Sequence, residues 1–209
     1  MRAALAVLLI VSCAVTASAQ GTDGGREQGS GPDRESVGRF LAGAAAGFGA
    51  HEAGHLIAGV SFGASPRVRA IEFGGLPFFA IDHDPVTARR ELVISSAGFW
   101  VQHAGSEWLL STRPQLRHEH APLLKGVLAF NLAASAVYGA AAFGAFGPPE
   151  RDTRGIAVSV GKDGIAEPVV GALVLGPALL DGYRYLRPES SWAKWASRGL
   201  KVAGALLSW

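Results

Sequence analysis

Long runs of apolar residues alternate with short polar stretches along this chain. Four of these runs have the length of a membrane-spanning helix, which needs about 20 mostly apolar residues. The first run is rich in glycine and alanine, and small residues favour close packing between helices in a membrane. The pattern therefore predicts an all-α polytopic membrane bundle of about four core transmembrane helices, at about residues 37–62, 91–110, 123–146 and 165–186.

A different pattern separates the first two predicted helices. Two short runs at residues 68–73 and 76–81 flank Gly74 and Gly75, and this arrangement predicts a small β-hairpin. Pro77 weakens the second run as a central strand, because proline has no backbone N–H to donate. The bundle is therefore expected to carry one minor hairpin.

The two ends of the chain differ from its middle. Residues 1–19 combine Arg2, an apolar run and a small-residue cleavage site, which is typical of an N-terminal signal peptide. Residues 20–36 are glycine-rich and polar and predict a disordered linker. Residues 37–187 would then form the membrane-embedded domain. Residues 188–209 mix tryptophan with lysine and arginine, which predicts an amphipathic helix at the membrane interface.

Composition supports a membrane location and argues against some functions. Charged residues make up 17% of the chain, below the usual share of about a quarter, and the mean hydropathy is +0.24. The net charge of +2, with no block rich in lysine or arginine, argues against nucleic acid binding. Cys13 is the single cysteine, so disulfide bonds and cysteine-ligated metal are excluded.

The arginines between the first two predicted helices indicate an orientation. Arg67, Arg69, Arg89 and Arg90 would face the cytoplasm if the signal peptide places the linker outside, in agreement with the positive-inside tendency. We therefore expect a multi-pass protein of the cell membrane. The signal peptide indicates a bacterial inner membrane.

The first predicted helix contains His51-Glu52-Ala53-Gly54-His55, an H-E-x-x-H motif. Residues four apart lie on one face of a helix, so both imidazoles can bind one Zn²⁺. Glu52 is then placed to act as a general base on a water molecule. Ionisable side chains within a membrane segment usually serve a function. This favours a metal site over histidines that merely bond to neighbouring helices.

Two histidines leave a catalytic zinc site incomplete, since such a site usually takes three protein ligands and a water. The candidates for the third ligand are His103, Glu167 and Asp181. Asp181 is favoured, because a lone carboxylate in an apolar helix is costly unless it binds a metal or a cation.

These motifs together resemble the site-2 protease family of intramembrane zinc metalloproteases. The H-E-x-x-H motif is followed far downstream by Leu-Asp-Gly around Asp181, and residues 95–102, "SSAGFWVQ", resemble the small-Ala-Gly segment of the family. By this resemblance His51, His55 and Asp181 ligate zinc and Glu52 activates the water. The hairpin lies where the family carries a membrane-associated sheet, which could pair with an extended substrate.

Two features depart from the family pattern. The family usually has an Asn and a Pro upstream of Leu-Asp-Gly, and the Asn helps to position substrate or to stabilise an oxyanion. Here Pro177 is present without the Asn, and Asn131 or Gln102 would have to supply the amide from another helix. No second domain of PDZ type fits in the loops.

The sequence therefore predicts a membrane-embedded zinc metalloendopeptidase that hydrolyses peptide bonds of membrane-anchored proteins. A zinc-activated water would attack the peptide bond, with Glu52 as general base and Zn²⁺ as cofactor. The expected partners are such a substrate and the lipid bilayer, and no nucleic acid. The alternative is a non-proteolytic metal-binding membrane protein, either an inactive protease-like scaffold or a transporter, and the missing Asn favours this alternative.

Overall fold

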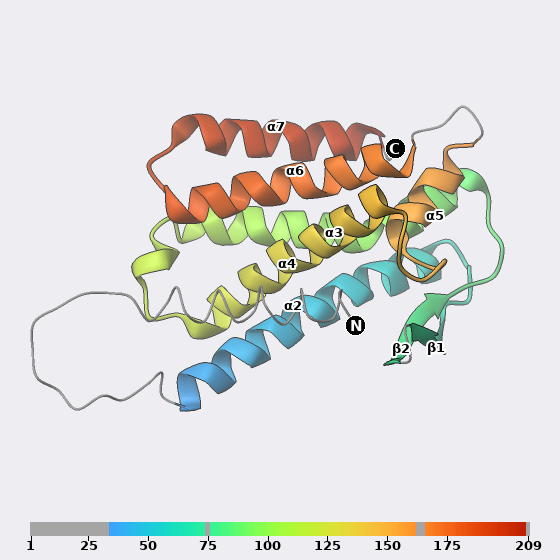
Figure 1. Cartoon of the computed structure of the whole chain (residues 1–209), viewed down its shortest axis with the longest axis horizontal. Coiled ribbons are helices and arrows are strands. Elements are labelled where there is room, and N and C mark those ends of the chain that lie inside the picture. The colour runs from blue at the N-terminus through green and yellow to red at the C-terminus, as the bar shows by residue number, and fades with distance from the viewer. Residues whose placement is uncertain (1–33, 74–75, 162–165, 208–209) are drawn as a thin grey trace, which may run out of the picture.

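Helices form most of the computed structural model, which describes residues 34–73, 76–161 and 166–207 (Figure 1). The predicted signal peptide, most of the predicted linker and the hairpin turn at residues 74–75 lie outside the described residues. Over the described ranges, the chain is a mainly helical protein with one small antiparallel sheet, as predicted.

Four long helices lie close to the predicted runs. Thr87 caps the second of them by accepting a hydrogen bond from the backbone N–H of Arg90, and Pro122 begins the third. Ala145 ends the third helix in the left-handed conformation, with φ of 48°. These are common helix start and stop signals. The four helices are α2 (Arg34–Ser61), α3 (Ala88–Thr112), α4 (Pro122–Gly144) and α6 (Glu167–Leu186), and a 3₁₀ turn (Leu116–His118) joins α3 to α4.

Glycines bring the backbones of α2 and α4 together. A Cβ at Gly43 would lie 1.9 Å from the carbonyl oxygen of Leu123, and a Cβ at Gly126 would lie 2.0 Å from that of Phe40. No other residue leaves room for this approach, because every other side chain begins with a Cβ. The small residues of the first predicted helix therefore serve helix packing.

The predicted hairpin is confirmed. Strand β1 (Arg67–Phe73) pairs antiparallel with β2 (Leu76–Asp82). Pro77 is tolerated because each strand of a two-stranded sheet has a free edge, where no N–H is required.

The hairpin lies beside the helix that carries the H-E-x-x-H motif. The ring of Phe79 in β2 packs edge-on against Phe48 in α2, with ring centroids 5.7 Å apart. Phe48 in turn contacts Phe130 of α4, with centroids 5.8 Å apart. These three aromatic rings fix the hairpin against the bundle.

Two helices in the described part of the chain, α4 and α6, are long and apolar enough to cross a membrane. Helices α2 and α3 have the predicted length, but polar side chains such as Gln102, His103 and Glu107 lower the hydropathy of α3. By length and composition, the four predicted spans are therefore reduced to two candidates.

The segment between α4 and α6 contains a further element, the short helix α5 (Asp152–Ser159), which the apolar runs of the sequence did not predict. A Cβ at Gly155 would lie 2.3 Å from Ser95 Oγ, so α5 packs closely against α3. Figure 1 shows α5 at the same end of the bundle as the hairpin.

Helix α7 (Ser191–Leu207) packs along α6 (Figure 1). Its polar residues Ser197 and Lys201 are buried, whereas its apolar residues Trp195 and Val202 are exposed. The predicted C-terminal amphipathic helix is therefore present, and its polar face is turned towards the bundle.

Candidate metal centre

The two histidines of the H-E-x-x-H motif lie side by side on α2. Their Nε2 atoms are 3.2 Å apart, and both side chains are buried. The spacing of four residues places them one helical turn apart on the face that packs against α3. The predicted pairing of His51 and His55 is therefore present.

Gly98 of α3 leaves the space that these imidazoles occupy. A Cβ at this position would lie 2.4 Å from His55 Nε2 and 2.5 Å from His51 Cε1. Distances this short exclude any side chain larger than hydrogen, because real atoms of these types do not approach so closely. The small-Ala-Gly segment noted in the sequence thus lies directly against the two histidines.

Asp152, the first residue of α5, completes a cluster of three potential ligands. Its Oδ2 atom lies 3.2 Å from His51 Nε2 and 3.3 Å from His55 Nε2. Ligand atoms at about 2.0–2.1 Å from a tetrahedral zinc ion lie about 3.3 Å from one another. The three side chains therefore have the chemistry and the spacing to hold a metal ion.

The outer contacts of His55 suit metal binding. Its Nδ1 atom lies 2.7 Å from the carbonyl oxygen of Ile94, which accepts the Nδ1 proton. This contact leaves the lone pair of Nε2 free for a metal, as an outer partner of a ligand histidine usually does.

Tyr138 of α4 supports the other two ligands. Its ring stacks on His51, with centroids 5.9 Å apart and an interplanar angle of 28°. Its hydroxyl interacts with the carboxylate of Asp152. In contrast, Nδ1 of His51 is buried and has no hydrogen-bond partner among the described residues.

The carboxylate of Asp152 is held in its charged form. Burial alone would raise its pKa, but the neighbouring charge of His55 and the hydrogen bond from His51 outweigh this effect. The net result is a pKa below the usual range for aspartate. An ionised carboxylate is the form that a metal ion requires.

Glu52 lies next to the cluster without joining it. The side chain is partly buried, and it interacts electrostatically with His51, His55 and Asp152. It is absent from the group of three ligands. A carboxylate in this position is free to exchange a proton with a group bound near the histidines.

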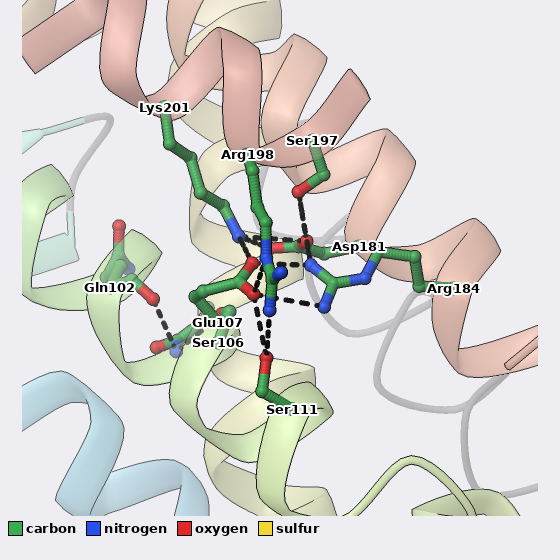
Figure 2. Close-up of polar contacts among 10 residues, drawn as sticks. Gln102, Ser106, Glu107, Ser111, Asp181, Arg184, Ser197, Arg198 and Lys201 are labelled. Atoms are coloured by element: carbon green, nitrogen blue, oxygen red, sulfur yellow. Dashed lines mark hydrogen bonds and ion pairs between the residues drawn. The ribbon is translucent and has the colours of Figure 1, made fainter. Parts of the chain in front are cut away.

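Asp181 lies elsewhere, and Asp152 replaces it as the third candidate ligand. The carboxylate of Asp181 accepts a hydrogen bond from Ser197 at 2.6 Å and forms ion pairs with Lys201 at 2.7 Å and Arg184 at 3.1 Å. Figure 2 shows Ser197 and Lys201 of α7 directed at Asp181, with Glu107 of α3 in the same cluster. The burial of this carboxylate is therefore offset by cationic side chains and not by a metal ion.

The other two candidates for the third ligand also have different surroundings. Glu167, at the start of α6, accepts hydrogen bonds from Arg151 at 2.6 and 2.7 Å and from Thr153 at 2.8 Å. His103 lines a cavity of about 60 Å³ between α3, α6 and α7, and its ring lies against Trp100 with centroids 6.1 Å apart. Neither belongs to the cluster around His51.

The two amides expected to act on substrate lie between α3 and α4. Asn131 Nδ2 donates to the backbone oxygen of Gln102 at 3.1 Å and to Ser106 Oγ at 3.0 Å. The amide of Asn131 thus holds the two helices together. The side chain of Gln102 is 1% exposed, and neither of its polar atoms has a partner among the described residues.

Sequence reasoning missed Asp152 because it searched for the third ligand within apolar segments. Asp152 lies in "GPPERDTRG", a polar stretch between the third and fourth predicted helices. The available signal was a possible helix start, since Asp152 follows two prolines and precedes a threonine. Such a signal predicts a helix terminus without indicating its distance from α2.

Comparisons of this chain with models of protein families, with curated proteins and with solved structures gave no match. The chemistry of the site therefore has to be inferred from its own geometry.

Proposed function

We propose that this protein is a membrane-embedded zinc metalloendopeptidase. The observation that carries the proposal is the convergence of His51, His55 and Asp152, whose ligand atoms lie 3.2–3.3 Å apart. Two imidazoles, one carboxylate and an open position form a ligand set of catalytic zinc sites in hydrolases. The resemblance to the site-2 protease family then rests on the H-E-x-x-H motif and its helical setting.

Zinc fits this donor set better than the harder cations. Imidazole nitrogens suit zinc and other transition metals, whereas magnesium and calcium prefer sites made of oxygen ligands. When bound, a zinc ion supplies a Lewis acid that polarises a carbonyl and acidifies a water ligand. The chain itself contributes three oriented ligands and a neighbouring carboxylate.

Glu52 is the proposed proton carrier. Its carboxylate accepts a proton from the attacking water and delivers that proton to the amine that leaves when the peptide bond breaks. The position of Glu52 beside all three ligands, and outside their cluster, suits this role. His51 and His55 are unsuited to it, because each directs Nε2 at the cluster.

The proposed substrate is a membrane-anchored protein whose helix unwinds before cleavage. A peptide bond in a helix is sheltered by backbone hydrogen bonds, so an extended segment must reach the site. The hairpin offers free strand edges to such a segment. Contact between Phe79 and Phe48 keeps the hairpin beside α2, the helix that carries Glu52.

The distribution of side chains supports a membrane environment. Large apolar residues are exposed along the outer faces of α2, α6 and α7, while charged residues of the same helices are buried. This arrangement reverses the usual one for a protein in water. The exposed set includes Ile57, Val60, Leu179, Leu186, Trp195 and Val202, and the buried set includes His51, His55, Asp181, Arg184 and Lys201.

A paired experiment tests the proposal. The full chain, purified in detergent, should contain about one zinc per chain, and the Glu52→Gln variant should retain that zinc. In cells, new N-termini in membrane proteins should arise with the wild type and disappear with Glu52→Gln. The exposed Glu189 between α6 and α7 offers a matched control, since Glu189→Gln should change neither result.

Each other outcome has a clear meaning. A wild-type protein without zinc would contradict the metal site. Zinc retained without any cleavage by the wild type would support the alternative of a non-proteolytic metal-binding protein. Cleavage that persists in Glu52→Gln would contradict the role of Glu52.

A further inference from the structure

Three buried polar side chains near the metal centre lack hydrogen-bond partners among the described residues. They are His51 through Nδ1, Gln102 through both atoms of its amide, and Ser135 through Oγ. Each of these residues is at most 2% exposed. A buried polar group without a partner is destabilising, so three such groups in one region call for a ligand.

His51 and Gln102 approach the same space from two helices. A Cβ on Gly98 would lie 2.7 Å from His51 Nδ1, so this nitrogen lies against the backbone of Gly98. Gln102 follows Gly98 by one turn on α3. Side chains in a helix lean towards its N-terminus, which directs the amide of Gln102 back over Gly98.

Ser135 reaches this level from α4. Two contacts fix the register of α3 against α4. Phe99 packs edge-on against Tyr138 with centroids 4.9 Å apart, and Asn131 bonds to Ser106 at 3.0 Å. Ser135 lies between Asn131 and Tyr138 in α4, so it falls opposite the segment of α3 that contains Gln102.

We propose that these three groups bind one buried water molecule, and that Gln102 is thereby a positioning residue for His51. The water accepts the proton of His51 Nδ1 and donates to Gln102 Oε1, and Ser135 Oγ is its third partner. About three hydrogen bonds are typical of a buried water. The bridge is a water because the two side chains make no direct hydrogen bond.

This bridge would give Nδ1 of His51 a hydrogen-bond partner, as the carbonyl oxygen of Ile94 does for Nδ1 of His55. A partner for Nδ1 keeps the proton on that nitrogen and leaves the lone pair of Nε2 for the metal. The inference rests on the proposed metal-binding function, but the state of the imidazole can also be measured without metal.

The first test uses the metal-free full chain, labelled with ¹⁵N at histidine and studied by NMR in detergent micelles. In this metal-free state Nε2–H of His51 donates to Asp152 Oδ2, 3.2 Å away, so the bridging water donates to the lone pair of Nδ1. Gln102→Leu removes the amide with little change in size, and should shift the ¹⁵N resonance of His51 Nδ1 because this hydrogen bond is lost. Ser106→Ala is the matched control, because it removes a buried hydroxyl one turn farther from His51 and should leave this resonance unchanged.

The second test measures zinc affinity by competition with a chromophoric chelator. Loss of an outer partner of a ligand histidine typically weakens metal binding by about 10–100-fold, and we expect this range for Gln102→Leu. Ser135→Ala should have a smaller effect in the same direction. Gln102→Glu should restore affinity, since a carboxylate also accepts the bridging hydrogen bond.

An unchanged Nδ1 resonance of His51 and an unchanged dissociation constant in Gln102→Leu would overturn the inference and leave the metal site intact. If wild-type protein binds no zinc, the proposed function fails, and the NMR result still decides the role of Gln102. Equal losses in Gln102→Leu and Ser106→Ala would also overturn the inference, because they would indicate a general packing defect.

Discussion

Arg151 and Glu167 form a two-pronged ion pair, with Nε–Oε1 and Nη2–Oε2 distances of 2.6 and 2.7 Å, directly beside the candidate ligand Asp152. Thr153, on the other side of Asp152, donates to the same carboxylate at 2.8 Å. Glu167 therefore holds both neighbours of Asp152. The first turn of α5 is fixed to the start of α6, and the position of the third ligand depends on this contact.

Replacing Glu167 should consequently weaken metal binding. Glu167→Gln loses the charge that pairs with Arg151, so α5 is no longer fixed and Asp152 moves relative to the histidines. We expect the zinc dissociation constant to rise about 10–100-fold, as for other outer partners of metal ligands. Competition with a chelator measures this change.

The exposed pair of Arg113 and Glu119, 2.9 Å apart, provides the control for that experiment. Glu119→Gln removes a surface ion pair, which is worth about 0–1 kcal/mol, and should leave zinc affinity unchanged. Equal affinity in Glu167→Gln and the wild type would show that α5 holds Asp152 without this contact.

Asp152 and Asp181 should behave differently when each is changed to asparagine. Asp152→Asn removes a ligand, so bound zinc should fall well below one per chain. Asp181→Asn should keep about one zinc per chain, because Asp181 bonds to Lys201, Arg184 and Ser197 instead. Metal analysis of the two purified variants distinguishes them, and the reverse result would return Asp181 to the metal site.

The same Asp181→Asn variant should be less stable than the wild type. Removing one partner of a buried ion pair typically costs about 3–5 kcal/mol, because the other charge stays buried. Here two cations, Arg184 and Lys201, lose their shared carboxylate. Chemical denaturation measures the loss of unfolding free energy, and an unchanged value would mean that Glu107 alone suffices for both cations.

Gly98 and Gly105, both on α3, should differ in their tolerance of alanine. A Cβ at Gly98 meets both imidazoles within 2.5 Å, whereas the nearest atom to a Cβ at Gly105 is Asn131 Nδ2 at 3.6 Å. Gly98→Ala should therefore abolish zinc binding, and Gly105→Ala should preserve it. Tight zinc binding by Gly98→Ala would place the histidine rings farther from α3 than described.

The lowered pKa of Asp152 should make the metal-free protein sensitive to acid. A carboxyl group with a lower pKa in the folded state stabilises that state above its unfolded pKa, which is about 3.9 for aspartate. The contribution of Asp152 to the unfolding free energy is complete above its unfolded pKa. It is lost as the pH falls below that value towards the folded pKa.

Chemical denaturation of the wild type and of Asp152→Asn at several pH values tests whether this contribution falls with acidity. The difference in unfolding free energy should be largest near pH 5–6 and should shrink below about pH 4. A difference that grows with acidity would contradict the assigned direction.

The sequence predicted the local parts of this structure well. The spacing of His51 and His55 within one helix fixes their pairing, because an α-helix sets the distance between residues four apart. The hairpin was also predictable, since two short apolar runs around Gly74-Gly75 specify it locally.

Contacts between segments far apart in the sequence were harder to predict. Asp152 and Asp181 are both single carboxylates in the second half of the chain, and their surroundings depend on α5 and α7. An amphipathic pattern in α7 indicates two faces without saying which one packs inward. The inward direction of Lys201 is what provides Asp181 with a cation, and the sequence pattern left that direction open.

The ion cluster of Figure 2 has a consequence for the order of assembly. Glu107 and Asp181 belong to helices that leave the ribosome before α7, yet Arg198 and Lys201 of α7 pair with them. Until α7 arrives, Arg184 is the one basic side chain available to both carboxylates within this cluster. The ion cluster is therefore complete only after the residues beyond 190 have been translated. A nascent chain that stops before them would keep an uncompensated negative charge between α3 and α6.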